Sequence, residues 1–446
     1  RALGLRLMRF KTGTPARVDR RTIDFAKTSI QEGDPTAPAF SFLTDVMPHE
    51  QTPCYLSYTN ERTHAVIRAN LHRAPMANGV IEGVGPRYCP SVETKIARFP
   101  DKERHQLFLE PEGLHTNEIY VQGMSTSLPT DVQEAFLTTI EGLEHARIMR
   151  PGYAIEYDCL DPLQLAPTLA VKDIAGLYSA GQANGTSGYE EAAAQGLVAG
   201  INAARELTGE EPLILRRSDG YIGVLIDDLV TKGTDEPYRM MTSRAEYRLI
   251  LRQDNADLRL TPIGRAMGLV TDERWARFTA KRDAIEATLA LLRERRLSPS
   301  AETEARLAAA GIAPLRVPMP LFALLSREGD YRRLAALFDL PALPDDVREE
   351  VEIMARYDGY LRKQQEQIAR MERLESRRIP DELDYAEITS LRLEAAEKLA
   401  AIRPRSIGQA SRISGVSPAD ISVLLVYLEK ERRSHGGEND GAQRFT

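Results

Sequence analysis

The sequence reads Ser179-Ala180-Gly181-Gln182-Ala183-Asn184-Gly185-Thr186-Ser187-Gly188-Tyr189-Glu190-Glu191 where an apolar stretch ends and a run rich in alanine and glycine begins. We predict a strand over residues 174–180, a loop over 181–188 and a helix over 189–207. The order strand, turn, helix is typical of an α/β fold.

The glycines of this turn carry a functional hypothesis. Without a Cβ atom, glycine lets backbone N–H groups and a helix N-terminus approach an electron-rich ligand closely. Gly181, Gly185 and Gly188 therefore mark a candidate cofactor site. The alternative is a plain strand-to-helix connection with a packing face of small residues. Gly196 and Gly200, four residues apart, predict that the helix lies tightly on a sheet.

The composition is that of a folded protein with several domains. The chain has 446 residues, of which 42% are hydrophobic and 28% are charged. No run of 18 apolar residues occurs, so we expect no transmembrane helix and no membrane partner. The first ten residues are too short and too basic for a signal peptide.

Charge and cysteines narrow the function classes further. The net charge is −7, so nucleic-acid binding has to come from a local basic surface. The three cysteines, Cys54, Cys89 and Cys159, are odd in number and widely spaced. This spacing disfavours a disulfide scaffold or a CxxC metal site, and reduced thiols indicate a cytoplasmic protein.

The pattern changes along the chain. Residues 1–160 are mixed α/β, with short apolar stretches broken by glycine and proline at 79–81, 106–109 and 118–121. From about residue 211, Arg, Glu, Leu and Ala recur at helical spacing. Two long amphipathic helices are predicted within 345–400. One face of the second carries Ile388, Leu391, Ala395, Leu399 and Ile402.

A candidate reactive thiol stands in the stretch Gly83-Val84-Gly85-Pro86-Arg87-Tyr88-Cys89-Pro90-Ser91. A helix is predicted over 92–99, so Cys89 would stand near its N-terminus, beside Arg87 and close to Lys95. Positive surroundings lower a thiol pKa and make a better nucleophile. The alternative is a buried structural cysteine, which is how we interpret Cys54 and Cys159.

The segment Tyr238-Arg239-Met240-Met241-Thr242-Ser243-Arg244-Ala245-Glu246-Tyr247-Arg248-Leu249-Ile250-Leu251-Arg252 has four arginines and one acid. Arg244, Arg248 and Arg252 are spaced to share one side of a helix, with Arg239 close by. Arginine suits bidentate phosphate binding, so RNA contact is one hypothesis. The other is a solvated face paired with Glu246, Asp254 and Asp257.

Residues 406–428 predict a helix, a turn and a second helix. Ser417, Pro418 and Asp420 form a start signal for the second helix, and Gly415 ends the first. The second helix has almost no basic or amide side chains before Lys430, so DNA-groove reading is disfavoured. A docking surface for a protein or structured RNA and a plain three-helix bundle both remain open.

Several of these segments together resemble the MnmG (GidA) family. The matching segments are Lys11-Thr12-Gly13-Thr14-Pro15-Ala16-Arg17, Asn60-Glu61-Arg62-Thr63-His64, 83–91, Arg150-Pro151-Gly152-Tyr153-Ala154-Ile155-Glu156-Tyr157-Asp158, 180–196, 237–260 and 406–428. They cover nearly the whole chain in the family's order, and the match is weakest at about 295–345.

The resemblance implies an α/β plus all-α fold class. A glutathione-reductase-like FAD domain would be interrupted by an inserted α/β domain and followed by a helical C-terminal domain. The expected boundaries are 1–14 for a remnant of the FAD domain, 15–157 for the insert, 158–210 for the return of the FAD domain and 211–446 for a tRNA- and partner-binding domain. The family's early GxGxxG turn is absent, so we expect a fragment that lacks the N-terminal part of the FAD domain.

The resemblance also implies an activity. The family adds a carboxymethylaminomethyl group at C5 of the tRNA wobble uridine (position 34), with FAD, NADH, a methylene-tetrahydrofolate carbon donor and glycine or ammonium. It acts as a homodimer with the partner GTPase MnmE, in a heterotetramer, and binds no DNA. A flavin supplies redox and one-carbon chemistry that side chains lack.

Residue by residue, the resemblance places Cys89 as the catalytic thiol. The expected cofactor contacts are Gly181, Gln182, Asn184, Gly185, Gly188, Gly85, Pro86, Arg87, Tyr88 and Lys95, and the expected tRNA contacts are Arg239, Arg244, Arg248 and Arg252. Two rival functions stay open: a folate- and FAD-dependent tRNA uridine methyltransferase, and a non-catalytic fragment that binds tRNA or the partner.

Overall fold

The computed structural model describes residues 2–35, 39–45, 51–88 and 90–440, with side chains to 431. The chain divides into two compact units. Unit 1 comprises Arg1–Ala203 and Gly233–Arg239, and unit 2 comprises Ala204–Lys232 and Met240–Thr446. Unit 1 is mixed α/β and unit 2 is helical apart from one short strand pair, as the sequence predicts. The four domain boundaries expected from the resemblance stay predictions.

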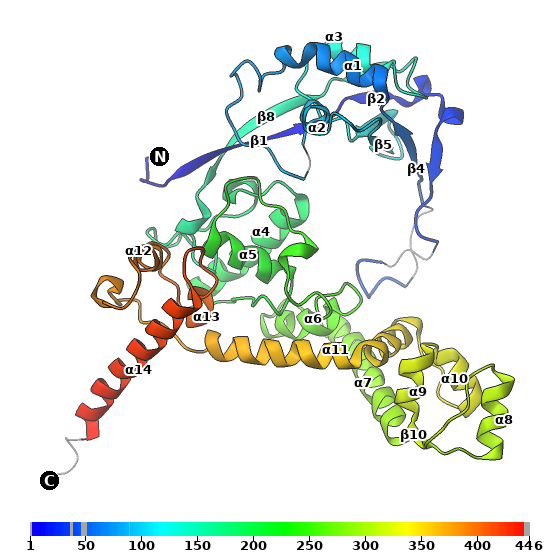
Figure 1. The fold of residues 1–446 in the computed structure, drawn as a ribbon, viewed down its shortest axis with the longest axis vertical. Coiled ribbons are helices and arrows are strands. Elements are labelled where there is room, and N and C mark those ends of the chain that lie inside the picture. Colours follow the sequence, from blue (N-terminus) through cyan, green and yellow to red (C-terminus); the bar gives the residue numbers. More distant parts are fainter. Residues whose placement is uncertain (1, 36–38, 46–50, 89, 441–446) are drawn as a thin grey trace. The chain divides into compact units, whose positions relative to one another are not determined.

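A six-stranded antiparallel sheet forms the larger part of unit 1, in the order β3-β4-β5-β6-β2-β7. The strands are β2 Arg17–Asp19, β3 Ser29–Gln31, β4 Cys54–Tyr58, β5 Gln106–Pro111, β6 Glu118–Gln122 and β7 Ile148–Arg150. Three helices supply the other side of its core: α1 Glu61–Asn70, α2 Val92–Arg98 and α3 Thr130–Leu137 (Figure 1).

Alternation of apolar residues explains the central strands of this sheet. Leu107 and Leu109 of β5 are fully buried, as are Ile119 and Val121 of β6, because every second side chain faces the helices. The apolar stretches at 106–109 and 118–121 therefore lie in strands β5 and β6. The stretch at 79–81 is an exposed turn instead, since Gly79 has a positive φ and Val80 faces solvent.

A second, two-stranded ladder lies at the base of this sheet domain (Figure 1). Strand β1 Leu7–Thr14 pairs antiparallel with β8 Tyr153–Leu160, from Leu7 opposite Leu160 to Thr14 opposite Tyr153. The free edge of β1 is joined by a single parallel bridge to Val84. Chain segments that are far apart in sequence thus meet along β1.

The predicted strand at 174–180 is wrong. These residues form turns and isolated bridges, because Gly176 has a positive φ and the backbone closes a tight turn from Ile174 to Leu177. The helix that follows is confirmed as α4 Tyr189–Thr208. Its Gly196 and Gly200 are exposed, and a Cβ at either meets nothing within 4 Å among the described residues, so they pack on no described sheet.

Unit 2 is built from helices, which are α5 Tyr221–Lys232, α6 Ala256–Ala266, α7 Asp272–Glu294, α8 Ala301–Ala309, α9 Leu321–Glu328, α10 Tyr331–Phe338, α11 Asp345–Glu375, α12 Leu393–Ile402, α13 Ile407–Ala410 and α14 Pro418–Asp440. Its hydrophobic clusters include one that joins α7, α9, α10 and α11 and a smaller one around Val224, Tyr247 and Leu251. Strands β9 Arg296–Leu297 and β10 Met319–Pro320 form a short pair. No described helix is long and apolar enough to cross a membrane.

The prediction of two long helices within 345–400 is half right. Helix α11 has 31 residues, whereas α12 has 10. Ile388 is buried, but it follows a 3-10 turn at Tyr385–Glu387 and precedes the start of α12. The buried residues therefore keep a helical spacing upstream of α12, although the chain is not helical there. Arg403, in the left-handed region before Pro404, ends α12.

The C-terminal start signal is confirmed. The Ser417 backbone N–H and hydroxyl both donate to the Asp420 carboxylate at 2.8 and 2.6 Å, and the Asp420 N–H donates back to the Ser417 hydroxyl. Arg392 donates to the same carboxylate at 2.6 Å and so ties the start of α12 to the start of α14. These bonds hold the pKa of Asp420 well below its usual range, chiefly through Arg392.

Candidate functional site

The glycine-rich turn has the backbone conformation that glycine permits. Gly181 and Gly185 have φ values of +74° and +83°, in the left-handed region. A Cβ atom at Gly185 would also lie 3.1 Å from the Phe10 ring and 3.2 Å from the Thr234 methyl group. The Gly185 carbonyl accepts from the Tyr238 N–H at 2.7 Å. The turn is therefore closely packed against β1 and the segment at 233–239.

Buried amides hold the turn from inside. Asn184 is fully buried, and its Nδ2 donates to the Ser179 carbonyl at 2.7 Å and to Gln195 Oε1 at 2.9 Å. Gln195 Nε2 donates in turn to the Thr186 hydroxyl at 3.2 Å. Asn184, expected to contact a cofactor, therefore faces the protein interior, and its amide positions the turn.

Gln182 is the exposed amide of this turn. The neighbouring Gly188 permits Glu191 to fold back, because a Cβ there would lie 1.8 Å from Glu191 Oε2. The turn thus presents the Gln182 amide at its surface, and α4 follows it.

The segment before Cys89 lies along β1. The Lys11 N–H donates to the Val84 carbonyl at 2.9 Å, and a Cβ at Gly83 would lie 2.8 Å from the Phe10 carbonyl group. Glu156 of β8 accepts from the N–H groups of Glu82 and Gly83, and the Gly83 bond is the largest cause of its lowered pKa. Glycine is therefore required for this close approach.

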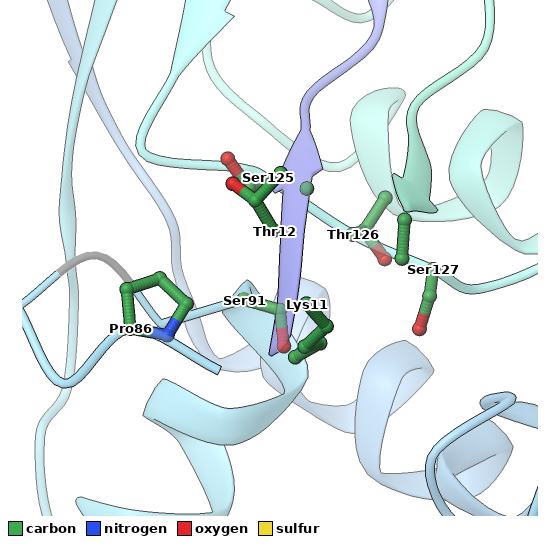
Figure 2. A pocket seen from close by; sticks show the side chains of 9 residues that line it. Lys11, Thr12, Pro86, Ser91, Ser125, Thr126 and Ser127 are labelled. Atoms are coloured by element: carbon green, nitrogen blue, oxygen red, sulfur yellow. The ribbon is translucent and has the colours of Figure 1, made fainter. Parts of the chain in front are cut away.

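A pocket opens beside this contact (Figure 2). Its lining comes from β1, β8, the segment before α2 and the loop after β6. The lining residues are Lys11, Thr12, Gly13, Pro86, Ser91, Ser125, Thr126, Ser127 and Ala154. Pro86, a predicted cofactor contact, is among them. The pocket belongs entirely to unit 1.

Lys11 is the charged residue of this pocket, and sequence reasoning gave it no role of its own. It is 5% exposed, and burial lowers its pKa, while the negative charge of Glu93 raises it in part. Glu93 is also buried, and its Oε1 accepts from the Ser127 N–H and hydroxyl at 3.0 and 2.9 Å. The sequence marks Lys11 only as the first residue of the stretch 11–17.

Cys89 lies outside the described residues, so its catalytic role stays a prediction. The helix predicted at 92–99 is confirmed as α2, which begins at Val92 after Ser91. Arg87 and Tyr88 are exposed, whereas Lys95 Nζ donates to the Gly123 carbonyl at 2.9 Å.

The other two thiols are partly or fully buried. Burial raises the pKa of Cys159 to about 11 and also raises the pKa of Cys54. Both are free cysteines that suit a structural role.

The arginine segment does not form the predicted helix. Residues 242–244 make a 3-10 turn and the rest is irregular up to α6, so Arg244, Arg248 and Arg252 do not share a helix side. Arg239 belongs to unit 1 and lies 3.8 Å from Glu191. Arg248 is exposed and makes no ion pair within the described part of the chain.

Arg252 faces the protein. Its guanidinium donates to both oxygens of Asp254 and, at 3.0 Å, to the buried Glu350 of α11. Arg244 is half-buried, and its carbonyl accepts from Arg217. For Arg252 the paired interpretation is therefore correct, and Arg248 and Arg239 are the exposed cations of the segment.

Family models match three parts of the chain. Residues 1–211 match "Glucose inhibited division protein A", residues 272–365 match the "tRNA modifying enzyme MnmG/GidA C-terminal helical domain" and residues 367–445 match the corresponding C-terminal helical bundle. The first match covers most of the mixed α/β unit, and the other two lie within the helical unit.

Curated relatives and solved structures agree. The tRNA uridine 5-carboxymethylaminomethyl modification enzyme MnmG of Clostridium kluyveri is 57% identical over 97% of this chain and 69% of its own length, and that of Caldicellulosiruptor saccharolyticus is 58% identical over the same shares. Aquifex aeolicus GidA in its form II crystal superposes with a TM-score of 0.85 at 45% identity, covering 96% of this chain and 68% of that one. This chain therefore belongs to the MnmG (GidA) family.

Proposed function

We propose that this chain takes part in C5 carboxymethylaminomethyl modification of the wobble uridine of tRNA. The observation that carries the proposal is the identity of 57% to a relative named for this modification, over 97% of the chain. We expect the chemistry at the turn of residues 181–188, which carries the exposed Gln182 at the start of α4.

FAD is the proposed cofactor, and the residues of the turn fit it. Gln182 is exposed and can face a ligand, and Gly181 and Gly185 give the turn the left-handed backbone that holds Gln182 at its surface. When bound, the flavin supplies hydride and one-carbon transfer. The chain's own residues hold the turn rigid through the Asn184–Gln195–Thr186 bonds.

The remaining cofactors and partners are proposed from the family resemblance. They are NADH, contacted by Gly85, Pro86, Arg87, Tyr88 and Lys95, methylene-tetrahydrofolate, the GTPase MnmE and a second copy of the chain, in the cytoplasm. Cys89 is the proposed catalytic thiol. Exposed apolar side chains on α12 and α14, Leu393 and Val426, support a partner surface on the C-terminal module.

tRNA contact is proposed at Arg239, Arg244 and Arg248. Two of them are exposed, and arginine binds phosphate through paired N–H donors. Arg252 has its donors turned toward two carboxyl groups, so it supports the segment from within.

The test is reconstitution with the 446-residue chain, MnmE, tRNA, FAD, NADH, methylene-tetrahydrofolate and glycine, followed by nucleoside mass spectrometry. The expected product is 5-carboxymethylaminomethyluridine at position 34, lost when Cys89→Ala replaces the chain and retained with the matched control Cys54→Ala. Ribothymidine as the product would favour the methyltransferase. tRNA binding without product, flavin retention or Cys89 dependence would favour a binding fragment.

A further inference from the structure

Helix α11, the long helix of unit 2 in Figure 1, is exposed on one face along its middle turns. Its first turns are buried through Val347, Val351 and Ala355, which join the core with α7 and α9. Nearer its end, Ile368 packs against the cluster around Val224. These contacts hold α11 in place while part of its middle remains open to solvent.

Five side chains at helical spacing make up this exposed face, which we call the α11 stripe. They stand at positions i, i+4, i+7, i+11 and i+14, and they therefore share one side of the helix. All five are exposed, and Tyr360 is 63% exposed. With a rise of 1.5 Å per residue, the stripe is about 21 Å long. Its residues are Arg356, Tyr360, Lys363, Gln367 and Arg370.

The α11 stripe is positively charged and contains no acid. None of its three cations forms an ion pair within the part of the chain that the structure describes, and Arg356 donates to the Gly329 carbonyl at 3.3 Å. The neighbouring Arg362, off the stripe, is instead paired with Asp358 at 2.8 Å. Glu366 is an exposed acid on the adjoining face. On a chain with a net charge of −7, the stripe is a local basic surface.

The arginine segment proposed to contact tRNA runs beside the same helix. Gln364 Nε2 of α11 donates to the Glu246 carbonyl at 3.3 Å, and Arg252 donates to Glu350 of α11 at 3.0 Å. Because these two bonds fix both ends, the chain between Glu246 and Arg252 lies along α11. The exposed Arg248 is in this stretch, so the α11 stripe extends the proposed tRNA surface onto the helix.

We propose that the α11 stripe binds the sugar–phosphate backbone of the substrate tRNA, an inference that rests on the proposed function. Arg356, Lys363 and Arg370 supply N–H donors and positive charge to phosphates, and the Gln367 amide donates to a phosphate or a 2′-hydroxyl group. The Tyr360 ring suits stacking on an unpaired base. An acidic protein would meet the same cations, but continuity with the arginine segment favours RNA.

The test is tRNA binding by the 446-residue chain, measured by fluorescence anisotropy at several salt concentrations. Arg356→Gln, Lys363→Gln and Arg370→Gln should each reduce the slope of log binding constant against log salt concentration by about 0.7–0.9, the value for one phosphate contact. Arg362→Gln is the matched control, because it removes one charge from the same helix but off the stripe. It should leave the slope unchanged.

Two further variants separate direct contact from overall charge. Tyr360→Leu should weaken tRNA binding at least about fivefold with an unchanged salt slope, because stacking releases no counterions. Glu366→Gln should strengthen binding, since it removes a negative charge beside the bound phosphates. All of these side chains are exposed, and circular dichroism shows that each variant is folded.

Unchanged slopes in all three cation variants would overturn the proposal, as would an equal loss in Arg362→Gln or a parent chain that binds no tRNA. Poly-glutamate binding that depends on the stripe, with tRNA binding that does not, would assign the surface to an acidic protein instead. Wobble-uridine modification with unchanged slopes would refute the stripe alone. Stripe-dependent tRNA binding without the modified nucleoside would refute the proposed function alone.

Discussion

Arg252 shows why spacing in a sequence does not separate a phosphate-binding arginine from a structural one. Its spacing from Arg248 predicted a shared helix face, but the segment is irregular, and each side chain takes the direction that its local turn gives it. Arg252 is turned toward Asp254 and Glu350, whereas Arg248 faces solvent. Which carboxylates approach from α11 depends on tertiary contacts that sequence spacing does not contain.

Removal of Arg252 should therefore destabilise unit 2. Arg252→Ala leaves two partly or fully buried carboxyl groups without their cation, and we expect the free energy of unfolding to fall by about 3 kcal/mol. Urea unfolding followed by tryptophan fluorescence measures it. A loss below about 0.5 kcal/mol would contradict the structural role of the guanidinium.

Arg248→Ala should leave stability unchanged and affect tRNA binding instead. It removes an exposed side chain, so stability should stay within about 0.5 kcal/mol of the parent. If Arg248 contacts a phosphate, the slope of log binding constant against log salt concentration for tRNA should fall by about 1. Filter binding at several salt concentrations provides the slope, and an unchanged slope would remove Arg248 from the tRNA surface.

Glu350 adds a pH dependence to unit 2. Burial, with a hydrogen bond to Asp254, raises the pKa of Glu350 to about 8, above that of the unfolded chain. The folded state then binds the extra proton, so stability should fall as pH rises from about 4.5 through 8. Glu350→Gln mimics the protonated acid and should flatten this slope, whereas Glu349→Gln, at an exposed neighbour, should not. Urea midpoints at pH 6 and pH 8.5 test it.

Helix glycines give a prediction at the scale of the element, because two of them have opposite surroundings. A Cβ at Gly223 in α5 would lie 2.0 Å from the Arg216 carbonyl oxygen, so Gly223→Ala requires a backbone shift and should cost more than about 2 kcal/mol. Gly200→Ala in α4 meets open space and should stabilise the helix by about 0.5–1 kcal/mol. Thermal unfolding followed by circular dichroism compares them, and destabilisation by both would mean that α4 is covered.

Elements were predictable where the sequence supplies local signals. Residues that are close in sequence determine the capping bonds of Ser417 and Asp420, and they also determine the apolar alternation in β5 and β6. These elements are confirmed. The strand at 174–180 was not, because an apolar stretch reports burial and not hydrogen bonding to a neighbour strand. Likewise the pocket at Lys11 joins residues from 11 to 154, which no local pattern brings together.

At the scale of the whole molecule, the two units should respond to acid in opposite ways. In unit 1, His64 is buried and bonded to the Thr59 hydroxyl at 2.8 Å, and its ring lies 5.4 Å from that of His105. Burial lowers the pKa of both histidines, so the unfolded chain takes up protons first and unit 1 should lose stability as pH falls below about 6.5. Unit 2, through Glu350, should gain stability over the same range.

One tryptophan makes this difference measurable. Trp275 is the only tryptophan in the chain and belongs to α7 of unit 2, so its fluorescence reports on that unit, while far-UV circular dichroism reports on both. At pH 5.5 the circular dichroism transition should begin at lower urea than the fluorescence transition, and His64→Gln should bring the two closer. Coincident transitions at pH 5.5 and pH 7.5 would show that the units unfold as one.

The ladder of β1 and β8 has a consequence for how such a chain can change over evolutionary time. Thr14 and Tyr153 are paired at the end of the ladder. The chain between them therefore leaves the ladder after Thr14 and re-enters it directly opposite, at Tyr153. Opposed Cα atoms in such a pair are about 5 Å apart, a gap that a tight turn closes. A hairpin joined there would keep the ladder intact without the intervening fold. That fold can thus be exchanged, enlarged or deleted as a cassette, and the strands that carry it need not be redesigned.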